Sequence, residues 1–462
     1  MELVIRSEIP SKTEGHRSAA PVFEYDRVPG DSSAAHLRCD ATLVVVSSEE
    51  DTVDVEKVKL QDAQDEQKRE RGQGGKVKLK FLNGLRGIAS LLVVHTHAGY
   101  LKESTIAPSG VDIFFVLSAF LLTMLNESKI NKLVSRRDGP RQWLVTLADY
   151  FIKRLVRVYP LFATVAFVLT CMPEETRTHY YNLAHYNIQH WSIWEILTFE
   201  HRYYLFWTLP IEIGYYFIIP IFLVGVCLLG KYKWVAIAPL YVWVYYEGMH
   251  TSRGAHDRFR LHLPTFLAGS LAAVVYSELN KWVKERRFEP RIWQLSAIRG
   301  FEFLMICCVL ANVSRGDFKS WFRLFPSPDA EVPSVSLPIS ATIVIETLFP
   351  SAISRGLEWN FLCYSGKISF SMYLLHPFVN FQPFLTELPR IDQFIVRIVL
   401  VYALATTSYF LIERNCQRLG VNISKKLARF GGSAPARVEI ASTTSKSFVA
   451  RLIARLRGAD VA

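Results

Sequence analysis

Apolar stretches close to the length of a membrane-spanning helix recur along this chain and leave little room for a soluble fold. Half of the 462 residues are hydrophobic, and they fall in blocks instead of being spread evenly. A helix needs about 20 apolar residues to cross a bilayer, whereas a soluble domain would show more amphipathic periodicity. The sequence therefore predicts an all-α polytopic membrane protein with about ten transmembrane helices.

The expected spans have approximate bounds that can be read from the apolar blocks. They lie at 81–100, 111–126, 155–172, 207–229, 234–249, 261–277, 300–313, 335–352, 363–384 and 393–412. The seventh and eighth are the weakest, because they are short and contain Glu302 and Glu346. A re-entrant or cavity-lining segment is the alternative at both places.

Basic residues gather on one side of the expected spans. Lys76, Lys78 and Lys80 precede the first span, whereas the third loop opens with Glu174 and Glu175. Because cytosolic loops are enriched in Lys and Arg, both termini are expected in the cytosol, at the plasma membrane or an endomembrane. The same clustering explains the net charge of +11, so no nucleic-acid partner is expected.

Composition divides the chain into three regions. Residues 1–80 are polar and charged, and we expect a disordered cytosolic tail there. Residues 81–415 form the ten-span domain, and residues 416–462 form a basic cytosolic tail. Part of that tail has an amphipathic pattern, so adsorption to an anionic leaflet and simple disorder are both open.

The first apolar run carries two ionisable groups at a fixed separation. Arg86 and His97 stand eleven residues apart in FLNGLRGIASLLVVHTHAGY. On a helix this step turns roughly 1100°, about 20° past three full turns, and rises about 16 Å. The two side chains therefore share one face at opposite depths, whereas His95 points the other way. Charges inside a membrane are costly and usually face a cavity or a partner.

Four ionisable groups from four spans are expected at one level, in the outer half of the membrane: His97, Asp112, Glu212 and His376. An acid beside a histidine fixes the imidazole tautomer, so we interpret His97 and Asp112 as a general-base pair. Glu212 either orients or charge-balances that pair, or only holds the kink at Pro210. His376 either positions an acceptor or simply forms a hydrogen bond.

The inner ends of the spans are basic. The third span opens with FIKRLVRVYP, so Arg154 and Arg157 lie three residues apart on one helix face, at the depth of Arg86. Such a cluster suits phosphate groups. Ordinary positive-inside anchoring is the alternative for these arginines.

The loop at 179–207 is dense in aromatic residues and histidines. A lid over the outer mouth, a sugar-stacking platform and an interfacial helix without a chemical role all fit this composition. The four histidines of this loop have few carboxylates or thiolates near them, and the seven cysteines show no ligand spacing, so no metal site is expected.

Five segments resemble motifs of the acyltransferase-3 family of integral membrane acyltransferases, in the expected order over roughly residues 80–415. FLNGLRGIASLLVVHTHA resembles the opening motif, which places an Arg and a His eleven residues apart. GVDIFFVLSAFLLT, KRLVRVYPL, WTLPIEIGYYFIIP and SGKISFSMYLLHPF resemble the later motifs and carry Asp112, Ser118, Phe120, Arg154, Arg157, Trp207, Glu212, Ser369, Tyr373 and His376.

The resemblance implies acyl transfer, typically from acetyl-coenzyme A to a hydroxyl of a carbohydrate, glycolipid or secreted small-molecule acceptor. The arginines would hold the donor phosphates, and no tightly bound cofactor is expected. His97, Asp112 and Glu212 would be catalytic, with His97 acting as general base or as acyl carrier. The remaining motif residues would bind substrate: Trp207, Ser369, Tyr373 and His376.

Three positions depart from the family pattern. Asn83 stands where Asp is usual, Ala119 where Gly is usual, and Ile213 replaces a frequent second Glu. A catalytically inactive acceptor-binding member of the fold is therefore one alternative. A transporter or channel is the other, although no convincing repeat between the two halves supports it.

Overall fold

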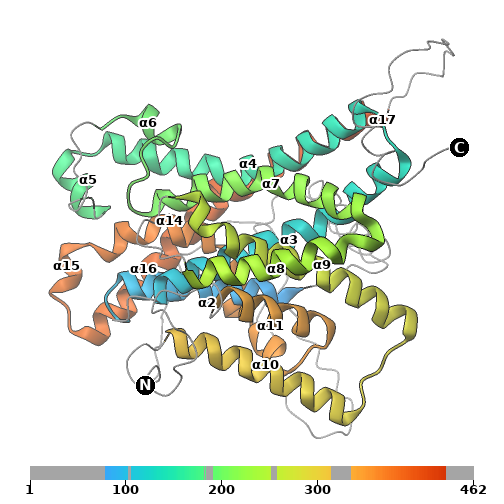
Figure 1. Ribbon diagram of the computed structural model, residues 1–462. Coiled ribbons are helices and arrows are strands. Elements are labelled where there is room, and N and C mark those ends of the chain that lie inside the picture. Colours follow the sequence, from blue (N-terminus) through green and yellow to red (C-terminus); the bar gives the residue numbers. More distant parts are fainter. Residues whose placement is uncertain are drawn as a thin grey trace, which may run out of the picture. The chain divides into compact units, whose positions relative to one another are not determined.

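The structure is a computed structural model that describes residues 79–101, 106–181, 183, 191–250, 258–313 and 335–432. Every regular element within these ranges is a helix, which confirms the all-α class (Figure 1). The expected N-terminal tail up to residue 78, and the chain beyond residue 432, lie outside the described residues.

The helices fall into a long and a short group. The long helices are α2 Lys80–His97, α3 Ile106–Arg136, α4 Pro140–Cys171, α7 Thr208–Leu229, α8 Lys233–His250, α9 Phe259–Arg286, α10 Ile292–Val313, α16 Arg390–Ser408 and α17 Arg414–Gly432. The short ones are α5 Glu174–Tyr180, α6 Ile193–Leu197, η2 Tyr204–Trp207, η3 Gly230–Tyr232, α11 Leu337–Leu348, α12 Ala352–Leu357, α13 Asn360–Lys367, α14 Ser369–Asn380, α15 Pro383–Thr386 and the π-helix η5 Tyr409–Glu413.

Six segments of the described chain are long and apolar enough to cross a membrane, which confirms a multi-pass membrane protein. They are Ile106–Arg136, Pro140–Cys171, Tyr204–His250, Phe259–Arg286, Ile292–Ala311 and Arg390–Leu427. The first expected span is present as α2, and the ninth as the pair α13 and α14, both outside these six. The expected count of ten stays a prediction.

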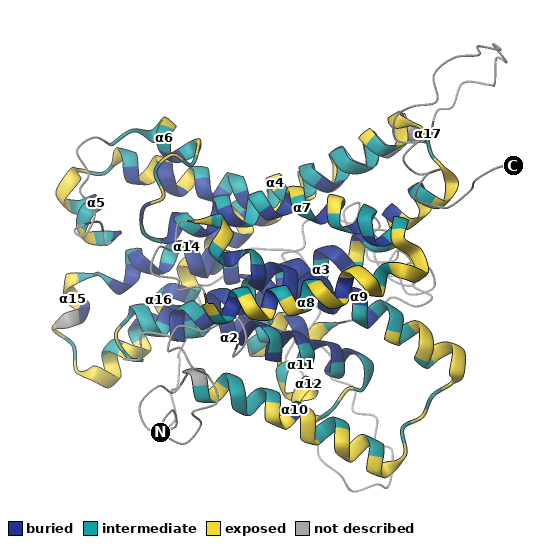
Figure 2. Ribbon diagram, in the orientation of Figure 1, coloured by how far each residue is buried: buried dark blue, intermediate teal, exposed yellow. Residues whose placement is uncertain are grey.

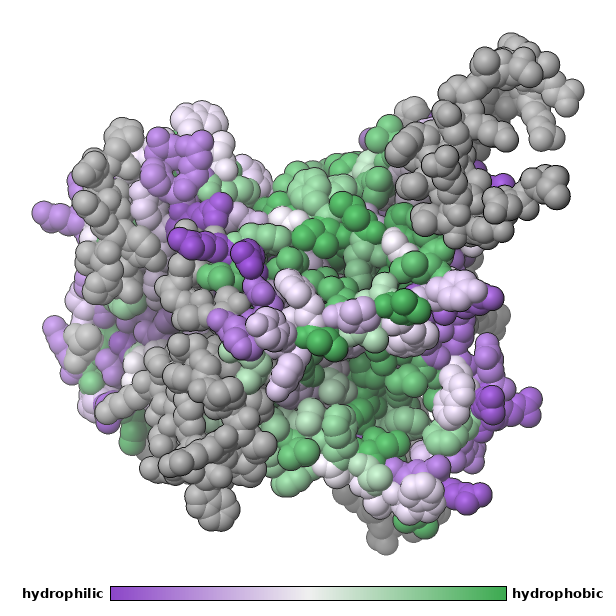
Figure 3. Space-filling view, in the orientation of Figure 1, coloured by the Kyte–Doolittle hydropathy of each residue, from purple (hydrophilic) through white to green (hydrophobic). Residues whose placement is uncertain are grey.

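The apolar helices differ in how much of their surface the protein covers. In the most apolar window of α3, 78% of the residues are buried, and in that of α9, 72%; for α10 the share is 11% (Figure 2). On the face shown in Figure 3, apolar side chains gather over the middle of the helices, with hydrophilic ones to both sides. A helix that is apolar all round and exposed suits contact with lipid.

Small residues let α2 approach its neighbours closely. A Cβ atom added at Gly84 would lie 1.8 Å from the carbonyl oxygen of Leu357, and one at Gly366 would lie 1.8 Å from that of Asn83. Helix backbones in membranes pack this closely only where the residues are small. The contacts fix the part of α2 that carries Arg86 against α12 and α13.

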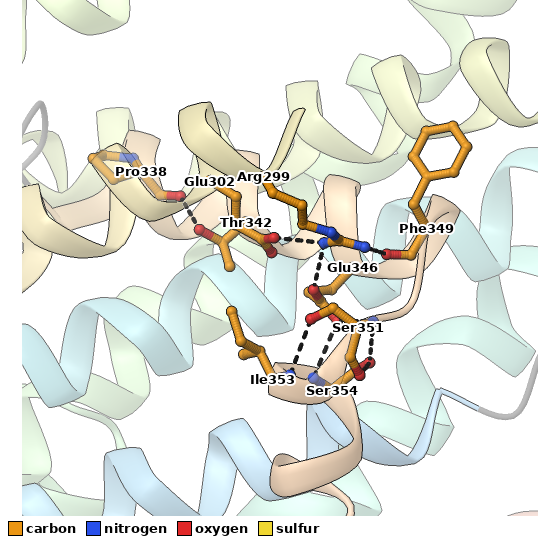
Figure 4. A network of polar contacts seen from close by, with 9 residues as sticks. All are labelled: Arg299, Glu302, Pro338, Thr342, Glu346, Phe349, Ser351, Ile353 and Ser354. Carbon is orange, nitrogen blue, oxygen red and sulfur yellow. Dashed lines mark hydrogen bonds and ion pairs between the residues drawn. The ribbon is translucent and has the colours of Figure 1, made fainter. Parts of the chain in front are cut away.

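The two acids in the weakest expected spans lie in one polar cluster, which we call the Arg299 network (Figure 4). Nη1 of Arg299 lies 2.5 Å from Oε2 of Glu302 and 2.8 Å from Oε1 of Glu346. Oε2 of Glu346 accepts the backbone N–H groups of Ser351 and Ser354 at 3.0 and 3.1 Å. Both carboxylates are only 1% exposed, so this network ties α10 to α11 and α12.

The eighth expected span is much shorter than predicted. It corresponds to α11, whose 12 residues rise about 18 Å, whereas the apolar core of a bilayer is roughly 30 Å thick. A buried Glu at its end and a capped turn after it suit a segment that lies against other helices.

The helical part continues past residue 415. The chain runs from α16 through the π-helix into α17, which packs against α4. Ser424 of α17 donates a hydrogen bond to Asp149 of α4. Residues 416–432, expected as part of a tail, are therefore held on the helical domain.

Candidate active site

A cavity of about 320 Å³ lies between α2, α3, α4, α7 and α14, and we call it the arginine cavity. Six of the predicted site residues line it: Arg86, Arg154, Arg157, Glu212, Ser369 and Tyr373. The aromatic and aliphatic part of the wall comes largely from α3, through residues that include Phe114, Phe115, Leu121, Leu122 and Leu125. The arginine cavity therefore joins a polar, cationic part to an apolar part.

Three guanidinium groups and one carboxylate give the cavity an excess of positive charge. Arg154 and Arg157 lie on one face of α4, and Arg86 of α2 interacts electrostatically with both and with Glu212. The Nε of Arg154 is buried and has no hydrogen-bond partner within the described part of the chain. A buried donor without an acceptor is costly, so this arrangement suits an anionic ligand with several oxygen atoms.

Glu212 is held by hydrogen bonds on its cavity side. Its Oε1 accepts from Ser118 Oγ at 2.8 Å and from Tyr216 Oη at 2.7 Å. Tyr150 in turn donates to the backbone carbonyl of Tyr216 at 3.1 Å. The acid thus lies among the arginines, and its role as partner of a general base stays a prediction.

His97 and His376 form a hydrogen-bonded pair with nearly coplanar rings. Nδ1 of His97 and Nε2 of His376 are 3.0 Å apart, with ring planes 5° from parallel and ring centroids 5.2 Å apart. His376 is fully buried, whereas His97 is partly exposed and has the ring of Tyr204 at 5.4 Å. The contact brings together the ends of α2 and α14, which carry these residues.

Tyr373 connects the arginine cavity to the histidine pair. It lines the cavity, and its ring centroid lies 6.3 Å from that of His376. Its hydroxyl donates to the backbone carbonyl of Leu205 at 3.3 Å, which fixes it against η2. The two histidines do not line the cavity themselves, so Tyr373 stands between them and the arginines.

Asp112 and Trp207 are the two predicted residues that neither line the arginine cavity nor belong to the histidine pair. Asp112 is buried on α3. A His97–Asp112 pair stays a prediction. Trp207 packs edge-on against Phe115 of the cavity wall, with ring centroids 6.3 Å apart.

The aromatic loop is only partly described, and His185, Tyr186 and His190 lie outside the described residues. Tyr181 and Phe206 are fully buried and pack against each other, with ring centroids 5.1 Å apart. Much of this loop therefore belongs to the core. Tyr204 is the member that reaches His97.

Sequence reasoning missed several polar residues around the site. Tyr216 lies one turn after Glu212, a spacing that places both on one helix face. Glu413 is buried on the π-helix and accepts a hydrogen bond from Ser371. Arg397 was visible as a charge inside the last expected span, a signal that points to function or pairing.

The comparisons with known proteins identify the family of the helical domain. An acyltransferase domain family matches residues 79–414. The O-acetyltransferase OatA of Staphylococcus aureus strain MRSA252 is 24% identical over 390 residues, covering 76% of this chain and 60% of that protein. OatA of strain NCTC 8325 / PS 47 is 24% identical over 376 residues, covering 74% of this chain and 58% of that protein.

The chain spans about three fifths of the length of these curated relatives, 60% and 58%. No solved structure matches the chain.

Proposed function

The chain belongs to the acyltransferase family whose domain matches residues 79–414, and from this premise we propose that it is a membrane O-acyltransferase. The donor is an acyl-coenzyme A, with acetyl favoured by the names of the O-acetyltransferase relatives. The acceptor is a hydroxyl of a carbohydrate, a glycolipid or a secreted small molecule. Both termini lie in the cytosol, at the plasma membrane or an endomembrane.

One observation carries the proposal: one side chain, that of Tyr373, lies between a cationic cavity and a histidine pair in which the His97 ring is partly exposed. The phosphate groups of coenzyme A match the excess of guanidinium groups from Arg86, Arg154 and Arg157. Glu212 offsets part of this positive charge when the donor is absent. The apolar wall from α3 suits the thioester end of the donor.

His97 performs the chemistry in one of two ways. As a general base it takes the proton of the acceptor hydroxyl while the oxygen attacks the thioester carbonyl, and coenzyme A leaves as the thiol. As a nucleophile it first forms an acyl-imidazole and releases coenzyme A, and the acceptor hydroxyl then takes the acyl group. In both cases the C–S bond breaks and a C–O ester bond forms.

The spacing of the two ends of α2 suits a donor of this length. Arg86 and His97 are separated by a rise of about 16 Å along the helix, comparable with the pantetheine arm of coenzyme A. Because Tyr373 lies between the cavity and His376, its ring has to shift or guide the thioester during transfer. The acceptor reaches His97 from its exposed side.

The test is release of coenzyme A by the purified full-length protein in lipid nanodiscs, with acetyl-coenzyme A and a panel of glycans and lipids. His97→Ala is expected to abolish release, by at least ~100-fold for the loss of a general base. His95→Ala is the matched control, since His95 lies on the same helix and donates to the carbonyl of Leu91 at 2.6 Å. We expect His95→Ala to keep wild-type turnover.

Near-wild-type release by His97→Ala would overturn the proposal. Uptake of labelled acceptor into sealed vesicles without any release of coenzyme A would favour the transporter alternative. Binding of the acceptor without release in wild-type protein would favour an inactive member of the fold.

A further inference from the structure

We propose that His376 and Arg397 are positioning residues that hold His97 as a single tautomer, with Nε2 as the nitrogen that accepts the proton or the acyl group. The inference rests on the proposed function and adds to it which atom reacts and which residues orient it. Six contacts at and near the C-terminal end of α2 carry the argument.

The protons of the histidine pair follow from its hydrogen bonds. A backbone carbonyl can only accept, so the contact of 3.2 Å from His376 Nδ1 to the oxygen of Met372 assigns a hydrogen to that Nδ1. The neutral ring then offers Nε2 as an acceptor, and the 3.0 Å contact assigns a hydrogen to Nδ1 of His97. His97 therefore carries its lone pair on Nε2.

The opposite arrangement of protons is unfavourable. It would place an imidazolium at His376, whose side chain is fully buried. When Nε2 of His97 takes a proton, by contrast, the charge forms on the partly exposed ring. The Nδ1–H of His97 then makes a charge-assisted hydrogen bond to His376, which stabilises the imidazolium.

Arg397 of α16 links the C-terminal ends of α2 and α14, the helices that carry His97 and His376. Its Nη1 donates to the carbonyl of Ala98, the residue after His97, at 3.1 Å. Its Nη2 donates to the carbonyl of Asn380, one turn after His376, at 3.2 Å. One side chain of α16 thus satisfies a terminal carbonyl of α2 and one of α14, where a cation is also favoured by the helix dipoles.

Asn380 of α14 adds a second direct link to α2. Its Nδ2 donates to the carbonyl of Val94 on α2 at 3.2 Å. Arg397 is only 7% exposed, and its Nη1 also contacts the hydroxyl of Tyr100 at 3.2 Å. Because the planar guanidinium spans both carbonyls, a lysine at this position could not replace it.

The first test compares variants at position 376 by release of coenzyme A from acetyl-coenzyme A, in full-length protein. His376→Leu removes the acceptor for His97 and should lower kcat at least ~100-fold, with the KM for acetyl-coenzyme A unchanged. His376→Gln offers an amide oxygen near the position of Nε2 and should recover a large part of kcat. Equal losses in both variants would contradict an orienting role.

The second test addresses the role of Arg397 with one test variant and one control variant on α16. Arg397→Met should lower kcat roughly tenfold, less than the roughly 100- to 10,000-fold that loss of the base itself would cost, with unchanged donor KM. Arg390→Met, at an exposed position in the first turn of α16, should behave as wild type. Unchanged kcat in Arg397→Met, or an altered donor KM with normal kcat, would overturn the assignment.

A third measurement separates this inference from the proposed function. Diethyl pyrocarbonate modifies accessible, unprotonated imidazole nitrogens, and peptide mass spectrometry gives the rate at His97 relative to His95. The ratio should fall several-fold in His376→Leu and in Arg397→Met, and recover in His376→Gln. Wild-type protein that releases no coenzyme A would refute the proposed function, whereas an unchanged modification ratio would refute the positioning role.

Discussion

Two clusters of buried charge in the described part of the chain differ in how their charges are paired. In the Arg299 network, the guanidinium group contacts both Glu302 and Glu346, and two backbone N–H groups donate to Glu346, in contacts of 2.5 to 3.1 Å. In the arginine cavity, three guanidinium groups share Glu212 around about 320 Å³ of space. Each cluster joins helices that are distant in sequence, but only the second leaves charge facing an open volume.

The difference teaches how to separate structural from functional charge in a membrane domain. The Arg299 network holds one cation between two buried carboxylates, so removing the cation leaves both of them buried and unpaired. The arginine cavity has surplus donors, including the buried Nε of Arg154. Variants in the first should therefore change stability, and variants in the second should change ligand binding.

The largest expected effect is on stability, from Arg299→Met. This change leaves two carboxylates that are 1% exposed without their cation, and we expect a loss of about 3 kcal/mol in unfolding free energy. Thermal unfolding in detergent measures it, with Arg291→Met, at an exposed position directly before α10, as control. A large change in the donor KM of the folded fraction of Arg299→Met would contradict the assignment of the Arg299 network to stability alone.

An intermediate effect on binding is expected from Arg86→Gln. Loss of a charged donor to phosphate should raise the donor KM roughly 30-fold, equivalent to about 2 kcal/mol. Lys80→Gln on the same helix is the control, because Lys80 is exposed and outside the cavity. An unchanged donor KM in Arg86→Gln would remove this residue from the phosphate role.

The smallest effects sharpen the comparison through two adjacent tyrosines. Tyr216 donates to Glu212 at 2.7 Å, whereas the Tyr215 hydroxyl forms a hydrogen bond with Ser270 at 2.8 Å. Tyr216→Phe should raise the donor KM about fivefold, and Tyr215→Phe should cost about 1 kcal/mol of stability with unchanged KM. The donor KM and the thermal unfolding of both variants are measured in parallel. Equal changes in both variants would show that the hydrogen bond to Glu212 does not contribute to donor binding.

Much of the site could be predicted from the sequence because helix spacing gives depth. Arg86, Arg154 and Arg157, which were expected at one depth, all line the arginine cavity, together with Glu212, which was expected at the depth of His97. Depth does not say which helices are neighbours, however. Asp112 and His376 were expected at one level, and only the packing of α2 on α14 shows that His376 forms a hydrogen bond with His97.

The fold was predictable in class but less so in the number of spans. Glu302 and Glu346 weakened two expected spans, and their pairing through Arg299 depends on contacts between α10 and α11 that hydropathy does not reveal. Hydropathy also does not reveal that the ninth expected span is divided into two helices, α13 and α14. Long apolar blocks can be recognised as helices from the sequence, whereas the partners of buried polar residues cannot be predicted from it.

The glycine contacts of α2 have a consequence for selectivity. Since neither Gly84 nor Gly366 leaves room for a methyl group against the facing backbone, α2 has little freedom to slide or rotate. Arg86 and His97 therefore keep a constant separation. On the proposed function, a donor that lacks the nucleotide half of coenzyme A would reach His97 but would make no contact with the arginines.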